Sequence, residues 1–188
     1  MSNADAVRAL EGKFKIVAKA EFRGETTLTI EPSAIRDLAT FCRDTLGFTY
    51  LVDVSSVDYF GEEPRFEMVY ELYQFEKGDH LRIKFRVSED DLNVSTVSNI
   101  WPTADWHERE IFDMMGINFT GHPDLRRILM WEGYPFHPLR KEFPLGGKAS
   151  DAPGVAFSKA APLAGGPFVS VPSAATTKDR EPRSRSAI

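Results

Sequence analysis

The sequence predicts an α+β fold, in which a mainly antiparallel sheet packs against helices and an extended C-terminal tail follows. Three runs between residues 50 and 88 alternate apolar and polar side chains, which is the two-residue period of strands with one buried face. Between residues 31 and 46 the apolar residues recur at helical spacing instead. No strand-like run leads into a glycine-rich loop and a helix, so the sequence shows no sign of a nucleotide cradle.

The first third of the chain predicts a helix, a hairpin and a second helix. Residues 4–10 form a short helix that Gly12 closes, and two alternating runs, broken by a turn at Gly24 and Glu25, form a hairpin. The Glu-Pro-Ser sequence at 31–33 opens the second helix, which ends near Gly47. Its apolar stripe consists of Ile35, Leu38, Ala39, Phe41, Cys42 and Leu46. Because Cys42 lies on this stripe, we expect a buried structural thiol.

Three strands are predicted at residues 50–60, 65–75 and 80–88. In the second, Phe66, Met68, Tyr70 and Leu72 face one way, and in the third Leu81, Ile83, Phe85 and Val87 do the same. The opposite rows are acidic on the second strand and basic on the third, which favours cross-strand ion pairs. Gly78 and Asp79 mark the turn between these two strands.

A last helix is predicted from Thr103, a suitable N-cap, to Met115, with Gly116 ending it. On this helix Trp106, Glu110 and Asp113 share one side, and Ile111, Met114 and Met115 face the core.

Ionisable residues crowd into this helix and the segment after it. His107 and Glu108 begin like a zinc-protease motif, but the second histidine would be residue 111, which is Ile111. Glu108 and Glu110 are two apart and point in different directions, so they do not flank one bond. We therefore expect Glu108 to be solvated and Glu110 to pair with Arg126 or Arg127 in an ion-pair network.

The composition of the chain excludes several classes of protein. The chain has 188 residues and a net charge of −5, which argues against a dedicated nucleic-acid binder, and its single cysteine rules out an internal disulfide framework. No run of 18 apolar residues occurs, and the first residues lack the apolar core of a secretory signal, so we expect neither a membrane span nor such a signal.

A change in amino-acid composition marks the end of the predicted body, residues 1–145. Residues 146–188 carry 6 basic and 3 acidic side chains, and 25 of these 43 residues are Gly, Pro, Ala or Ser. We expect this basic tail to be extended and to dock on a partner subunit, since it has few apolar anchors of its own.

The segment from Glu108 to Leu129 strongly resembles the signature of one family, the C subunit (30 kDa subunit) of NADH–quinone oxidoreductase, respiratory complex I. The matching residues are Glu108, Arg109, Glu110, Asp113, Gly116, Ile117, Phe119, Gly121, His122, Pro123, Asp124, Leu125, Arg126, Arg127, Ile128 and Leu129. Residues 135–145 also fit the family, whereas Trp131 stands where an acidic residue is expected. The resemblance covers about residues 10–145.

This resemblance implies a cofactor-free structural subunit in the peripheral arm of a proton-translocating complex that passes electrons from NADH to quinone. FMN and iron–sulfur clusters are expected in partner subunits, and the partners are the large subunit (designated D) and the cluster-bearing subunit (designated B). The place implied is the cytoplasmic side of the bacterial inner membrane, with the membrane reached only through the complex. The signature is expected to act as a structural interface made of Glu108, Arg109, Glu110, Asp113, Gly116, Gly121, His122, Pro123, Asp124, Arg126 and Arg127.

Two alternatives stay open at this point. One is the equivalent subunit of a membrane-bound hydrogenase-type complex, which has the same fold. The other is a free-standing metallohydrolase that uses His107, Glu108 and His122.

Overall fold

The computed structural model of the chain describes residues 3–145. The tail expected at 146–188, and the prediction that it docks on a partner, lie outside the described residues. Packing contacts define one unit that ends at Lys141, and the fold below is the fold of that unit.

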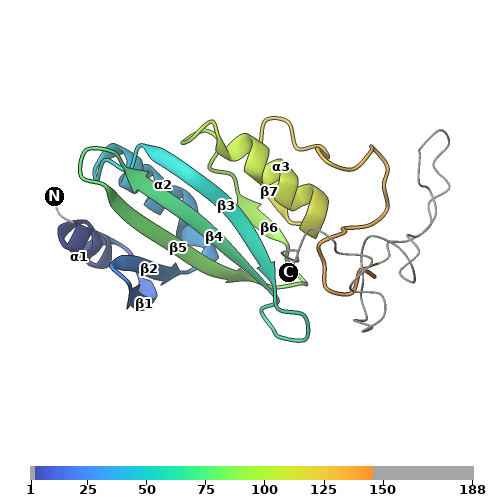
Figure 1. Ribbon diagram of the computed structural model, residues 1–188, viewed down its shortest axis with the longest axis horizontal. Coiled ribbons are helices and arrows are strands. Elements are labelled where there is room, and N and C mark those ends of the chain that lie inside the picture. The colour runs from blue at the N-terminus through green and yellow to red at the C-terminus, as the bar shows by residue number, and fades with distance from the viewer. Residues whose placement is uncertain (1–2, 146–188) are drawn as a thin grey trace, which may run out of the picture. The chain divides into compact units, whose positions relative to one another are not determined.

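A five-stranded sheet, a two-stranded sheet and three α-helices make up this unit (Figure 1). The sheet has the order β1-β2-β5-β4-β3, and its neighbours are antiparallel except for the parallel pair β2 and β5. The predicted α+β fold with a mainly antiparallel sheet is confirmed. Two short parallel strands, β6 and β7, were not predicted. In chain order the elements are α1 (Asn3–Lys13), β1 (Ile16–Phe22), β2 (Glu25–Ile30), a 3-10 turn (Pro32–Ala34), α2 (Ile35–Asp44), β3 (Tyr50–Asp58), β4 (Phe66–Gln74), β5 (Asp79–Val87), β6 (Asn93–Ser95), α3 (Ala104–Met115) and β7 (Asn118–Thr120).

The sheet has one buried apolar face and one charged face, as the alternating side chains of the predicted strands indicate. All eight apolar side chains expected on one face of β4 and β5 are buried. On the other face Glu71 lies opposite Arg82 and pairs with it. Lys84 Nζ lies 3.0 Å from a carboxylate oxygen of Glu67. The cross-strand ion pairs expected between the acidic and basic rows are therefore confirmed.

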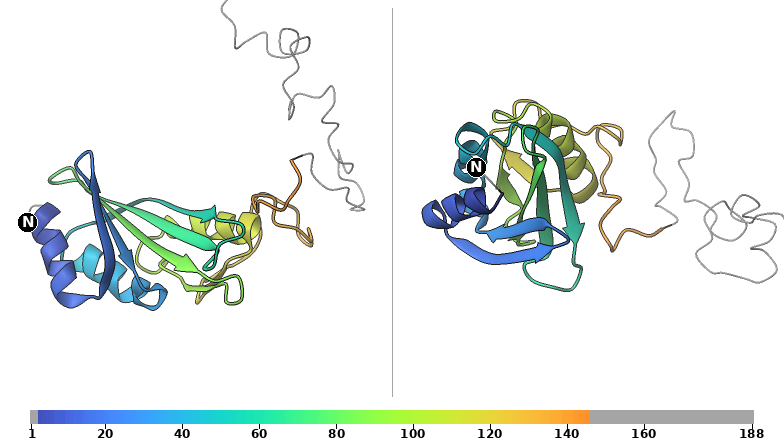
Figure 2. Two further views of the ribbon diagram at one scale, coloured as in Figure 1. Left: turned by 90° about the horizontal axis from the view of Figure 1, so that it is seen from below. Right: turned by 60° about the vertical axis from the view of Figure 1, so that its left-hand side comes forward.

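The helices bury their apolar sides in one core with the sheet. Figures 1 and 2 show α1 and α2 toward one end of the sheet and α3 beside the edge strand β3. Leu10 of α1, Leu38 of α2 and Ile111 of α3 belong to the same buried cluster. Cys42 is fully buried in it, and burial raises the pKa of its thiol. The prediction of a buried structural thiol is confirmed.

The hairpin between β1 and β2 turns one residue earlier than expected. Arg23 and Gly24 both adopt left-handed backbone angles, with φ of 51° and 84°. Two successive left-handed residues match the right-handed twist of the flanking strands, as in type I′ hairpins. No described helix is long and apolar enough to span a membrane.

Candidate functional site: helix α3 and the segments it holds

Helix α3 carries most of the ionisable residues that the sequence singles out. It ends at Gly116 as predicted, where φ is 79° and the backbone N–H donates to the carbonyl oxygen of Phe112 at 3.0 Å. Thr103 occupies the N-cap position, but its side chain makes no capping hydrogen bond. Trp106 lies on the exposed side of the helix, whereas Glu108 and Asp113 are both fully buried.

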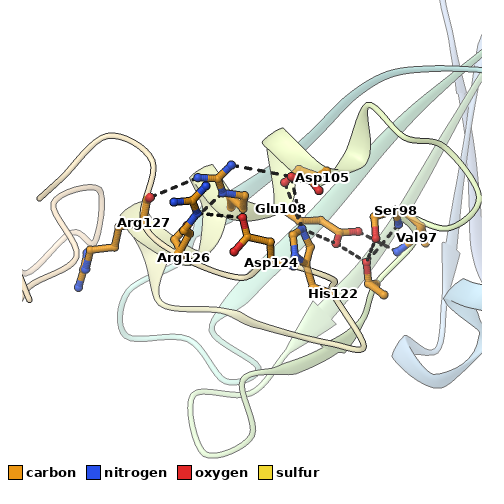
Figure 3. A network of polar contacts seen from close by, with 10 residues as sticks. Val97, Ser98, Asp105, Glu108, His122, Asp124, Arg126 and Arg127 are labelled. Carbon is orange, nitrogen blue, oxygen red and sulfur yellow. Dashed lines mark hydrogen bonds and ion pairs between the residues drawn. The ribbon is translucent and has the colours of Figure 1, made fainter. Parts of the chain in front are cut away.

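The burial of Glu108 corrects the expectation that its carboxylate is solvated. One carboxylate oxygen accepts the hydroxyl of Thr96 at 2.5 Å, and the other accepts the backbone N–H of Val97 at 2.8 Å. Thr96 in turn contacts the hydroxyl of Ser98 at 2.8 Å (Figure 3). Burial raises the pKa of the Glu108 carboxyl to about 7, although both hydrogen bonds act in the opposite direction. Glu108 thus attaches α3 to the segment that follows β6.

His122 attaches the next turn to the first half of the helix. Its side chain is fully buried, and its Nδ1 accepts the backbone N–H of Asp124 at 3.0 Å. That bond places the ring proton on Nε2, which donates to the backbone carbonyl of Asp105 at 3.2 Å. Nε2 also lies 3.9 Å from a carboxylate oxygen of Glu108 (Figure 3).

The turn that presents His122 depends on a left-handed glycine. Gly121 has φ of 84°, and Pro123, which is exposed, follows the histidine. The backbone N–H of His122 donates to the carbonyl of Phe119 at 3.2 Å, which closes the turn directly after β7. The chain thereby reverses and brings Asp124 back along α3.

Arg109 holds the backbone that continues from this turn. Its Nε donates to the carbonyl oxygen of Arg126 at 3.2 Å, and an Nη donates to that of Arg127 at 3.5 Å. The guanidinium lies 5.1 Å from the ring of Trp106, within cation–π range. Arg126 itself points to Asp124, with an Nε to carboxylate distance of 2.8 Å on the exposed surface.

Asp113 is the most heavily bonded group of the site. It accepts the guanidinium of Arg127 at 2.5 Å and the successive backbone N–H groups of Ile128, Leu129 and Met130 at 3.1, 2.7 and 2.8 Å. Burial alone would raise the pKa of this carboxyl, but the hydrogen bonds from Met130, Arg127, Leu129 and Ile128 hold it below its ordinary value. One carboxylate therefore fixes four residues that belong to no helix or strand.

The segment from 137 to 140 covers the C-terminal end of the same helix. The Nδ1 of His137 donates to the backbone carbonyl of Asp113 at 2.9 Å. The backbone N–H of Leu139 donates to the carbonyl of Met114 at 3.1 Å, and the Nε of Arg140 donates to that of Met115 at 2.7 Å. Helix-end carbonyls have no partner inside the helix, and a cation there also suits the helix dipole. Sequence reasoning missed the roles of His137 and Arg140, although both lie in the stretch from 135 to 145 that fits the family.

Glu110 does not make the ion pair that the sequence led us to expect. It is exposed, and within residues 3–145 no ion pair involves it. Its two expected partners are bonded elsewhere, since Arg126 pairs with Asp124 and Arg127 pairs with Asp113. The predicted pairing is wrong.

The residues of the metal-site alternative do not share one site, because His107 has a partner away from Glu108 and His122. His107 Nδ1 lies 3.1 Å from a carboxylate oxygen of Asp53 on β3, whereas His122 lies against Asp105 and Glu108. In the part of the chain that the structure describes, no group of three or more His, Cys, Asp or Glu residues is arranged to hold a metal ion. The polar side chains of α3 instead bind two irregular segments, around 96–98 and 122–130, and the backbone carbonyls at its C-terminal end bind a third, 137–140.

Comparisons with known proteins agree with one another. Residues 28–149 match the family model described as the 30 Kd subunit of the respiratory-chain NADH dehydrogenase. The C subunit of the NADH-quinone oxidoreductase of Geobacter sulfurreducens is 45% identical over 148 residues, which cover 77% of this chain and 91% of that protein. The C subunit of the same enzyme from Roseiflexus sp. is 48% identical over 133 residues, which cover 70% of this chain and 76% of that protein.

Two solved structures share the fold. A trypsin-resistant fragment (1-134) of Nqo5 superposes with a TM-score of 0.58 at 27% identity, and the match covers 66% of this chain and all (100%) of the fragment. A chain of the membrane-bound sulfane sulfur reductase, an archaeal respiratory membrane complex, superposes with a TM-score of 0.67. That match covers 77% of this chain and 87% of the other, and at 23% identity it shows the fold alone.

Proposed function

Because this chain belongs to the family of the 30 kDa subunit of the respiratory-chain NADH dehydrogenase, we propose that it is a cofactor-free structural subunit of a proton-translocating NADH–quinone oxidoreductase. In this proposal it supports electron transfer from NADH to quinone without carrying the electrons. FMN and the iron–sulfur clusters belong to other subunits. The chain sits in the peripheral arm, on the cytoplasmic side of the bacterial inner membrane.

The observation that supports a structural role is the use that α3 makes of its charged side chains. Glu108, Arg109 and Asp113 bond mainly to backbone groups of other segments, which they hold in place. These hydrogen bonds fix the conformation of the segments, and a subunit needs segments of fixed conformation to present a constant surface to its neighbours. The single cysteine of the chain, Cys42, is buried in the core, whereas iron–sulfur clusters need several thiolates.

The partners proposed are the large subunit (designated D) and the cluster-bearing subunit (designated B). The names of the relatives support membership of a complex with lettered subunits, since each is named as the C subunit of its enzyme. Contact with nucleic acid is not part of the proposal, and the membrane is reached through the complex.

Affinity purification of the full chain from its own cells tests this proposal. A tag on the chain should bring down the D and B subunits with NADH–quinone oxidoreductase activity, and deletion of the chain should abolish the assembled complex. The chain purified alone should show no flavin absorbance and no stoichiometric metal by elemental analysis. A flavin, cluster or metal bound to the purified chain, or a complete and active complex formed without it, contradicts the proposal. A large partner with nickel-binding cysteines would favour the hydrogenase-type alternative instead.

A further inference from the structure

A small hollow lies between α3 and the edge strand β3. Its volume is about 200 Å³, and buried apolar side chains of Val54, Ile111 and Met114 form part of its lining. Sites for small-molecule ligands usually measure about 300–1,000 Å³, so this hollow suits one side chain better than a free ligand. We call it the α3–β3 groove.

The polar lining of the groove is acidic and not fully paired. Asp53 and Glu110 line it. Among the described residues no lysine or arginine lines it, and the only lining group that can become cationic is His107, which already contacts Asp53. Glu110 is exposed and makes no ion pair with any described residue. The hydroxyl of Ser56 is shielded from solvent and, among the residues described, has no hydrogen-bond partner.

Exposed apolar side chains flank this acidic site. Leu139, which also lines the groove, is 55% exposed, and Trp106, one helical turn before Glu110, is 61% exposed. A long basic side chain has an apolar stem and a charged tip. The apolar lining and rim of the groove suit the stem, and the carboxylate without a partner suits the tip.

We propose that the α3–β3 groove receives an arginine or lysine side chain from another protein subunit of the complex. The stem of that side chain lies against Ile111 and Met114, its charged end meets the carboxylate of Glu110, and the hydroxyl of Ser56 accepts a further hydrogen bond. This inference rests on the proposed function, because it requires the chain to be one subunit among several. Charge complementarity favours a basic occupant, since a neutral segment laid over Glu110 would bury that carboxylate without a partner.

Carboxyl labelling of the full chain, alone and in the purified complex, tests whether the groove is covered. A water-soluble carbodiimide with an amine should label Glu110 in the isolated chain, and labelling in the complex should fall on the order of tenfold, as expected for a side chain buried at a subunit interface. Equal labelling in both samples overturns the inference. Protection of Glu110 already in the isolated chain also overturns it, because residues of this chain would then cover the groove.

Charge substitutions test the chemistry of the occupant. Glu110→Lys should lower the amount of chain retained in the complex on the order of tenfold, and Glu110→Gln should lower it less, because interface charge pairs depend on the sign of the charge. Glu76→Lys, at an exposed glutamate in the turn between β4 and β5, is the matched control and should leave retention unchanged. Thermal melting of each isolated chain checks that the variants still fold, as expected for exposed positions.

The outcomes separate the inference from the proposed function. If the chain and its Glu110→Lys variant are retained equally in the complex, the groove inference fails and the subunit proposal stands. If the tagged native chain brings down no other subunit, the subunit proposal fails, and the groove inference fails with it.

Discussion

Replacing Glu108 with glutamine should change how the stability of the protein depends on pH. The native carboxyl is buried between Thr96 and Val97, and burial raises its pKa from the ordinary value of 4.5 to about 7. Glutamine has the same shape and is neutral. Its carbonyl oxygen can accept the N–H of Val97, and its amide can donate to the hydroxyl of Thr96, which then donates to Ser98.

The magnitude follows from the difference between the folded and unfolded pKa values. Between pH 4.5 and about 7 the folded protein keeps the proton of Glu108 while the unfolded chain has released it. The contribution of the neutral carboxyl to stability is therefore fully present below pH 4.5 and is lost as the pH rises through about 7. Since one pKa unit corresponds to about 1.4 kcal/mol, the loss amounts to about 3 kcal/mol.

Urea unfolding of the isolated chain measures this effect. Trp101 is buried and donates its indole N–H to the carbonyl of Phe48, so its fluorescence reports unfolding. Relative to the native chain, Glu108→Gln should gain about 3 kcal/mol of unfolding free energy between about pH 4 and about pH 8. Burial lowers the pKa of His137, which acts in the same pH range with the opposite sign, but both proteins share that histidine and its effect cancels in the difference.

A matched variant separates the charge of Glu108 from its hydrogen bonds. Glu108→Leu leaves the N–H of Val97 without an acceptor, whereas the hydroxyl of Thr96 can still donate to Ser98. Compared with Glu108→Gln, it should therefore lose about 1–3 kcal/mol at every pH. If the native and Glu108→Gln unfolding free energies stay parallel from acid to neutral pH, the carboxyl does not titrate in this range and the reasoning is refuted.

Three further predictions concern α3 and α2. Asp113→Asn should lower the free energy of unfolding by about 3–5 kcal/mol, because it removes the charge from a buried ion pair and sets amide hydrogens against N–H donors, either those of Arg127 or those of the backbone. The exposed Asp124→Asn should change it by less than about 1 kcal/mol in the same urea assay. Gly116→Ala should cost about 1–2 kcal/mol in thermal unfolding, since it strains a left-handed backbone and sets a Cβ 2.7 Å from side-chain nitrogens, while Gly12→Ala in open space on α1 should be neutral or stabilising. The thiol of Cys42 should not react with a maleimide until the chain unfolds, and labelling of the native chain at the unfolded rate would contradict its burial.

The long strands were predictable because each has one buried face. In β4 and β5 the side chains alternate over nine residues each, which is long enough for the period to be read from the sequence alone. The strands β6 and β7 have three residues each, so no period is visible, and they exist because distant segments meet. The parallel pairing of β2 with β5 also depends on the path of the chain through α2, β3 and β4, which local pattern does not encode.

The site was harder to predict than the sheet, and Asp113 shows why. Helical spacing correctly places it on the side of Trp106 and Glu110, and a side with a charged and an exposed aromatic residue reads as solvent-facing. The segment that buries Asp113 arrives more than a dozen residues later and bonds to the second half of the helix. Periodicity locates a face, but a later irregular segment decides whether that face is covered.

Buried carboxylates at two points of α3 need a reason other than stability, because well-packed apolar residues often stabilise a core as much as ion pairs do. A leucine at position 113 could fill the space, but it would leave the N–H groups of Ile128, Leu129 and Met130 without their acceptor, at about 1–3 kcal/mol each. An irregular segment has no ladder or helix to satisfy such groups, so only a fixed acceptor can hold it in one conformation. Asp113 supplies that acceptor and leaves the side chain of Leu129 60% exposed on a backbone that cannot shift freely. The charged residues of the signature thus fix the backbone that carries this apolar side chain, and a fixed backbone loses less entropy on binding than a mobile one.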